Sequence, residues 1–160
     1  MYRRKFLQAG FLSSAVVFGS GCSFFGIGSM RETLSIVQGD LFPKAQSLGI
    51  DTSEYLTIIF RHSRVSQEEK DFLKNGVKWL NEEAFTLYNK KYTALSRTKR
   101  EAVLETISQT QWGENWIYTL LNYIFEAMLG DPVYRSNRSE AAWKWLAFEG
   151  GVPRARRPFL

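Results

Sequence analysis

Cysteine and histidine are almost missing from this 160-residue sequence, which holds one of each. A single cysteine excludes an intramolecular disulfide. One cysteine and one histidine together cannot supply the several ligands that a structural zinc or an iron–sulfur cluster needs. The histidine, His62, is flanked by Arg61 and Arg64, so we expect it to pack or to cap a helix rather than to act in catalysis. We predict no metal site in this chain.

Motifs that bind nucleotides or present a nucleophile are also missing, since the sequence has no G-x-G-x-x-G, no P-loop and no G-x-S-x-G. The paired carboxylates Glu68–Glu69 are expected in the first turn of a helix, where the helix dipole favours negative charge. The pair Glu82–Glu83 is expected on a solvated helix face. We therefore predict no catalytic and no cofactor-binding residue in this chain, and a small exported hydrolase is the disfavoured interpretation.

The basic excess of the chain, a formal net charge of +5, is confined to its two ends. Residues 31–129 carry 12 basic and 13 acidic side chains, whereas residues 130–160 carry six basic and three acidic ones. A nucleic-acid-binding domain needs a continuous basic stripe, which this distribution does not provide. It excludes nucleic acid as a partner and is compatible with an acidic protein or an anionic surface.

The first 21 residues have the layout of an export signal. Three basic residues, Arg3, Arg4 and Lys5, precede a moderately apolar stretch that begins with Phe6 and Leu7. The arrangement R-R-x-F-L resembles the signal that the twin-arginine translocase reads, and that pathway exports folded proteins. A Sec signal or an N-terminal anchor with two arginines is the alternative. We expect a periplasmic protein, associated with the inner membrane.

Cys22 follows the small residues Gly19-Ser20-Gly21, as a lipidated cysteine would. Because Gly19 stands where a lipobox usually has leucine, an ordinary cleavage site or an uncleaved anchor remains open. The Gly/Ser-rich segment that follows is expected to be a flexible linker. We thus divide the chain into a signal over residues 1–21, a linker over 22–30 and one folded domain over 31–160.

The folded domain is predicted to be all-α, a single compact unit of about five or six helices. Apolar residues recur at helical spacing and nowhere alternate as in a strand. Helices are expected over residues 32–41 and 53–62, from a capping box at Ser66–Glu69 through an apolar stripe to Leu87, and from Ser96 or Thr98 onward. The most apolar helix, residues 114–129, should be central and buried, and Gly130 should end it.

The C-terminal segment departs from this plain helical pattern. An Asp-Pro turn with a tyrosine and an asparagine precedes a Trp-Lys pair and a tail rich in Gly, Pro and Arg. This block resembles the signature of the gluconate 2-dehydrogenase subunit 3 family, D-P-x-Y-G-G-N followed by G-W-K and G-x-P-R. The matching residues are Asp131, Pro132, Tyr134, Asn137, Trp143, Lys144 and Arg154. The sequence departs from the pattern at Arg135-Ser136 and at Ala142, where the family has glycine.

The resemblance implies a non-catalytic small subunit of a periplasmic dehydrogenase that oxidises a sugar or a sugar acid. In such complexes a large flavoprotein of the glucose–methanol–choline type holds FAD, and a cytochrome c subunit with haem c often passes the electrons on. The small subunit brings the export signal and stabilises its partner. The alternative is a free-standing periplasmic adaptor or lipoprotein without a dehydrogenase partner.

Two interpretations of the C-terminal block remain open. Asp131, Asn137 and Trp143 either stabilise the local fold, as a turn cap, a helix cap and a core residue, or contact the partner, as Tyr134 also would. Tryptophan and arginine are enriched at binding hot spots, so the interface candidates also include Trp145, Arg154, Arg156 and Arg157.

Overall fold

The computed structural model describes residues 27–50 and 52–158, and this part of the chain is helical and contains no strand. The all-α prediction is confirmed. The helices are α1 (Ile27–Leu41), α2 (Pro43–Ser47), α3 (Thr52–Arg61), α4 (Gln67–Tyr88), α5 (Arg97–Ser108), α6 (Gln111–Leu129) and α7 (Ala141–Trp145), with 3-10 turns η1 (Tyr92–Ala94) and η2 (Pro132–Tyr134). In the described part of the chain, no helix has the length and apolar character needed to cross a membrane.

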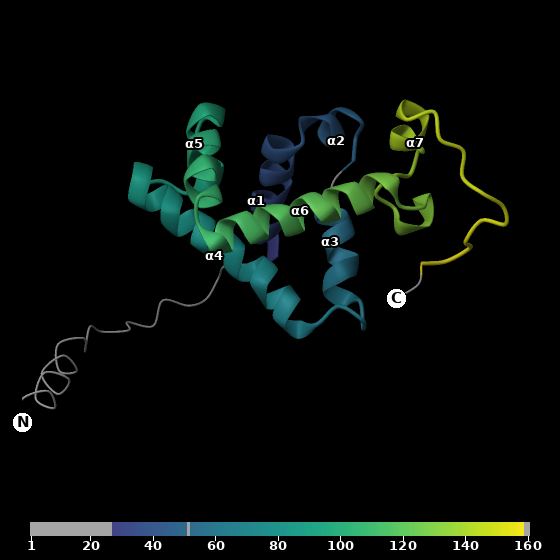
Figure 1. Cartoon of the computed structure of the whole chain (residues 1–160), viewed down its shortest axis with the longest axis horizontal. Coiled ribbons are helices and arrows are strands. Elements are labelled where there is room, and N and C mark those ends of the chain that lie inside the picture. The colour runs from purple at the N-terminus through teal and green to yellow at the C-terminus, as the bar shows by residue number, and fades with distance from the viewer. Residues whose placement is uncertain (1–26, 51, 159–160) are drawn as a thin grey trace, which may run out of the picture.

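Helix α6 lies at the centre of the fold, as its apolar sequence predicts (Figure 1). It packs against α1, α3, α4, α5 and α7. It begins earlier than expected, because the Thr110 hydroxyl caps it by accepting a hydrogen bond from the Gly113 amide at 3.1 Å. Gly130 ends it as predicted, although with φ −62° it is extended rather than left-handed.

The N-terminal helices depart from the predicted bounds. Helix α1 begins at Ile27, so residues 27–30 of the expected linker are helical. Pro43, predicted to stop this helix, also starts α2, because a proline lacks only an amide that the first helical turn leaves unpaired anyway. Helices α2 and α7 bring the total to seven α-helices in the described residues, above the predicted five or six.

Helix α4 begins with half of the predicted capping box. The Ser66 hydroxyl accepts from the Glu69 amide at 3.1 Å, as expected. The Glu69 carboxylate does not turn back to the cap but accepts a hydrogen bond from the Tyr123 hydroxyl, which ties α4 to α6. Burial and this contact raise the pKa of Tyr123. The apolar stripe of α4 is buried from Leu73 to Ala84, whereas Leu87 is exposed.

Helices α4 and α6 approach closely where Gly76 faces the fully buried Trp116. The indole Nε1 donates to the Leu73 carbonyl at 3.3 Å. A Cβ atom at position 76 would lie 2.0 Å from this nitrogen. Only glycine fits without a shift of one helix.

We expect Gly76→Ala to lower the free energy of unfolding by about 1–3 kcal/mol, because the added methyl overpacks the core. This outcome opposes the gain of about 1 kcal/mol that alanine brings in an unconstrained helix interior. Denaturant titration followed by circular dichroism measures it. Asn75→Ala, at the exposed neighbouring position, is the control and should be neutral or slightly stabilising. A Gly76→Ala protein as stable as the control would contradict the close approach.

A charged cluster joins α1 to α5 and η1. The Asp40 carboxylate, 4% exposed, accepts from Arg100 Nε at 2.7 Å and Nη2 at 3.0 Å, and from the Tyr92 hydroxyl at 2.8 Å. Arg100 Nη1 donates to the Leu95 carbonyl at 3.0 Å. Burial and the contact with Asp40 raise the pKa of Tyr92. Every member of the cluster has a partner, as a buried charge requires.

Candidate functional site

The turn after α6 is built by Asp131 and Pro132. The Asp131 Oδ1 atom accepts from the Val133 amide at 2.9 Å, and Pro132 opens the 3-10 turn η2. Arg135, which follows, has a φ of +70°, a conformation that favours glycine. The structure therefore gives Asp131 the local capping role that the sequence left open.

The C-terminal tail folds back onto this turn through Arg154. Its Nε donates to Asp131 Oδ2 at 2.9 Å, and its Nη1 donates to Glu140 Oε1 at 3.2 Å. Its guanidinium also lies over the Trp143 ring, 4.6 Å from the ring centroid. We call these four residues, Asp131, Glu140, Trp143 and Arg154, the tail clamp.

Trp143 is buried within this chain. It is 6% exposed, and its indole nitrogen donates to the Leu129 carbonyl at 2.8 Å. The Phe148 ring packs edge-on against it at 5.3 Å. A Cβ atom at Gly150 would lie 2.5 Å from this indole, so the tail passes close to it. Of the interface candidates, Trp143 and Arg154 thus contact each other, and their contact with a partner stays a prediction.

Asn137 contacts the first turn of the short helix α7, whose N-cap residue is Glu140. The Asn137 Oδ1 accepts from the Ala142 amide at 3.2 Å, which is a local role, but Asn137 does not occupy the expected N-cap position because α7 begins only at Ala141. The adjacent Ser136 hydroxyl donates to the Ala127 carbonyl at 2.9 Å and fixes the loop against α6. Both side chains are buried. The loop that carries the motif is therefore held at both ends.

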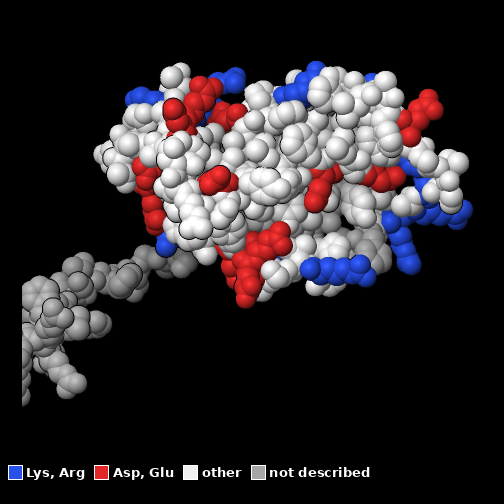
Figure 2. Space-filling view, in the orientation of Figure 1, with Lys and Arg blue, Asp and Glu red and all other residues white. Residues whose placement is uncertain are grey.

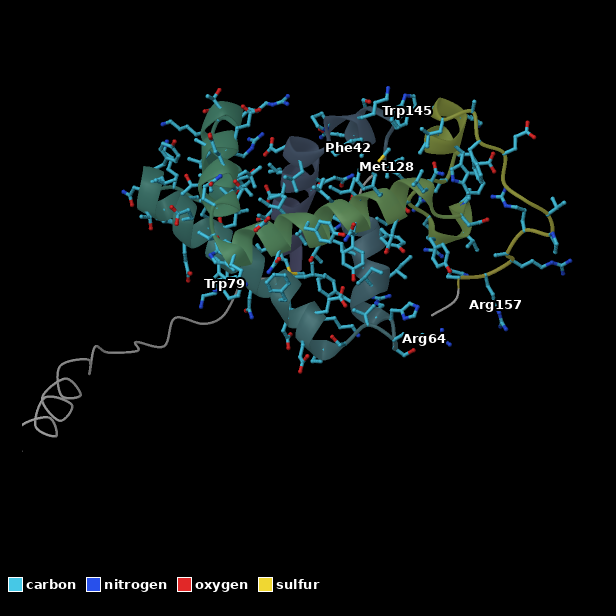
Figure 3. All side chains as sticks on the ribbon, viewed as in Figure 1. Phe42, Arg64, Trp79, Met128, Trp145 and Arg157 are labelled. Carbon is cyan, nitrogen blue, oxygen red and sulfur yellow. The ribbon has the colours of Figure 1, made fainter. Side chains whose placement is uncertain are left out.

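The remaining predicted residues lie nearer the surface. The Tyr134 ring packs edge-on against Tyr55 at 6.3 Å, and Lys144 Nζ donates to the Ser139 carbonyl at 2.7 Å. Trp145, the last residue of α7, is 46% exposed and is labelled in Figure 3, and Lys44 Nζ from α2 lies 5.1 Å from its ring centroid. Arg156 and Arg157 are exposed on the tail, and basic side chains gather beside it in Figure 2.

An exposed apolar surface adjoins the motif. It comprises Phe125, Leu129, Trp145, Leu146 and Phe148, each more than 40% exposed, and we call it the α6–α7 surface. The Phe42 ring contacts Phe125 at 5.3 Å, which extends the surface toward α2. Except for Trp145, sequence reasoning missed these residues and placed Phe125 in the core. That prediction was wrong because Phe125 lies on the outer side of α6, whereas its neighbours Ile124 and Met128 are buried.

The family model for gluconate 2-dehydrogenase subunit 3 matches residues 32–151. The chain belongs to this family. The matched segment runs from α1 through α7 and includes Asp131, Asn137 and Trp143, whereas Arg154 lies beyond it. No curated protein and no solved structure shows significant similarity to the chain.

Membership of the gluconate 2-dehydrogenase subunit 3 family makes the chain an accessory-type subunit of a multi-subunit dehydrogenase. The predicted export residues Arg3, Arg4, Phe6 and Leu7 and the predicted lipidation site Cys22 lie outside the described residues. The periplasmic location and the absence of a cofactor from this chain stay predictions.

The tail clamp should open at acid pH. The Val133 amide, and then Arg154, hold the pKa of Asp131 below its ordinary value. A depressed pKa stabilises the clamp above the ordinary value of roughly 4, and this contribution is lost as the pH falls through the folded pKa. We expect the Trp143 indole N–H signal to shift in an NMR titration below about pH 4. In Arg154→Gln the clamp is already open, so an equal shift in that variant would contradict the assignment.

Proposed function

We propose that this chain is the non-catalytic small subunit of a periplasmic, FAD-dependent dehydrogenase of the gluconate type. It carries the twin-arginine signal for a large flavoprotein of the glucose–methanol–choline type, which has no signal of its own, and stabilises that partner. A cytochrome c subunit with haem c completes the complex at the inner membrane. The match of residues 32–151 to the subunit 3 family, in a chain that opens with Arg3 and Arg4, carries the proposal.

The α6–α7 surface supports a protein partner. Exposed large apolar side chains that gather on neighbouring elements can mark interaction sites, and tryptophan is enriched where binding energy concentrates. Trp145 belongs to this surface, and Figure 3 shows Arg157 on the tail that follows α7. We place the flavoprotein on the α6–α7 surface, with Arg156 and Arg157 at the rim.

Co-expression with the flavoprotein encoded beside this chain tests the proposal. We expect an affinity-tagged chain to retain a yellow, FAD-containing protein, and Trp145→Ala to reduce the retained amount severalfold while leaving the melting temperature of the chain unchanged. Tyr118→Ala, at an exposed aromatic position of α6 outside the α6–α7 surface, is the matched control and should retain the full amount.

A colourless monomer from the wild-type chain would contradict the proposal and favour a free-standing periplasmic adaptor. Fatty acid on Cys22 would identify that adaptor as a lipoprotein. Retention of the flavoprotein by Trp145→Ala at the wild-type level would leave the subunit assignment intact and remove the α6–α7 surface from it.

A further inference from the structure

A hollow of about 130 Å³ lies between two connecting segments that are distant in the sequence. One wall is the turn between α2 and α3, residues 48–50, followed by Glu54 on α3. The other wall is the motif loop, residues 135–139. The hollow belongs neither to the α6–α7 surface nor to the tail clamp.

The buried wall of the hollow holds a hydrogen-bond donor without an acceptor. Asn137 is 1% exposed, and its Oδ1 is committed to the Ala142 amide. Its Nδ2 has no hydrogen-bond partner in the structure. Because a buried donor that has lost water and gained no acceptor is costly, a group that brings an acceptor to this amide is favoured.

The residues that line the hollow carry one more positive than negative charge. Arg138 forms an ion pair with Glu54, and its Nε donates to the Arg135 carbonyl at 2.9 Å. Among the described residues, no carboxylate pairs with Arg135, whose side chain is exposed. Arg135, which has no carboxylate partner among the described residues, thus lines the same hollow as Asn137 with its unpaired amide.

We infer that this hollow binds a carboxylate, which the flavoprotein partner supplies. A carboxylate has two oxygens and a single negative charge, so one oxygen can accept from Asn137 Nδ2 while the other meets the Arg135 guanidinium. That the flavoprotein supplies this carboxylate rests on the proposed function and on the basic excess of residues 130–160, which suits an acidic partner. The contact fixes the orientation of the partner on the α6–α7 surface.

Direct binding is tested on the full chain alone with acetate as the probe. We expect acetate, and not chloride, to shift the Asn137 side-chain amide signals in a ¹H–¹⁵N NMR titration. Arg135→Gly should weaken this binding about tenfold, the usual effect of losing one charge-assisted hydrogen bond. Glycine also suits the positive φ at this position, so this variant should keep or gain thermal stability while it loses affinity.

Lys90→Gln, which removes an exposed charge elsewhere, is the control and should bind acetate like the wild type. Inorganic phosphate serves as the competing anion. Equal shifts with phosphate and acetate, or acetate shifts that Arg135→Gly leaves unchanged, would overturn the carboxylate assignment.

The source of the carboxylate is tested by co-purification with the flavoprotein. We expect Arg135→Gly and Asn137→Asp each to lower retention about tenfold. Aspartate at position 137 keeps the acceptor for Ala142 and replaces the free donor with a repelling charge. If Asn137→Asp fails to fold, as a melting curve would show, Arg135→Gln replaces it.

The results distinguish a failure of the proposed function from a failure of the carboxylate assignment. If the wild-type chain fails to retain the flavoprotein, the proposed function fails first. If the wild type retains it and both variants retain as much, the partner does not supply the carboxylate, and acetate binding alone would then identify a site for a free carboxylate.

Discussion

Replacing Arg3 and Arg4 together by lysine is expected to leave this chain in the cytoplasm and to leave its flavoprotein partner there as well. The variant keeps both positive charges but loses the paired guanidiniums that the twin-arginine receptor reads. Because the partner is proposed to have no signal of its own, dehydrogenase activity should disappear almost completely from the periplasmic fraction. Cell fractionation followed by an activity assay with a dye as electron acceptor measures the loss.

Lys5→Gln provides the matched control for this experiment. It removes one positive charge and keeps the arginine pair, so export should remain close to the wild-type level. Normal periplasmic activity in the double-lysine variant would contradict twin-arginine export of the complex. Export of the flavoprotein without this chain would show that the partner has a signal of its own.

The second large effect is expected at the buried cluster of Asp40, Tyr92 and Arg100. Asp40→Ala should lower the free energy of unfolding by about 3–5 kcal/mol, because it leaves a largely buried guanidinium and a buried tyrosine hydroxyl without their acceptor. Because native domains are stable by only about 5–15 kcal/mol, this loss is a large fraction of the total. Urea titration at neutral pH measures it.

The exposed ion pair between Arg97 and Glu101, on the same helix α5, is the control. Arg97→Ala should change the free energy of unfolding by less than about 1 kcal/mol, because solvent screens such pairs. Replacing Asp40 by leucine, Arg100 by methionine and Tyr92 by phenylalanine at once should recover much of the loss, since no uncompensated charge then remains. A small effect of Asp40→Ala would show that the cluster is solvated.

Sequence periodicity predicted the long helices because each carries an apolar stripe of several turns. Helices α4 and α6 are of this kind, and their caps at Ser66 and Gly130 occupy the predicted positions. Five residues make little more than one turn, so α2 and α7 could not be recognised by periodicity. Exposure of Phe125 depends on which side of α6 the neighbouring elements cover, and an apolar pattern that runs almost all round the helix does not encode this.

Some contacts of the candidate site could likewise be predicted from the sequence, and others could not. The capping role of Asp131 follows from an Asp-Pro pair at the end of a helix, so the sequence could indicate it. The contact of Arg154 with Asp131 spans 23 residues and the hollow brings the turn at residues 48–50 against the motif loop. Such contacts depend on the tertiary arrangement, and only the structure reveals them.

The tail clamp limits how far the chain can be shortened from its C-terminus. The match to the family model ends at residue 151, and a recombinant chain shortened there would contain the whole matched segment. It would nevertheless lack Arg154 and leave the carboxylates of Asp131 and Glu140 without their common counter-ion. A chain shortened at 151 therefore reports on a damaged loop, whereas a chain that ends between Arg154 and Arg156 isolates the effect of the outer arginines. The shortest chain that keeps the tail clamp ends three residues beyond the segment that the family model matches.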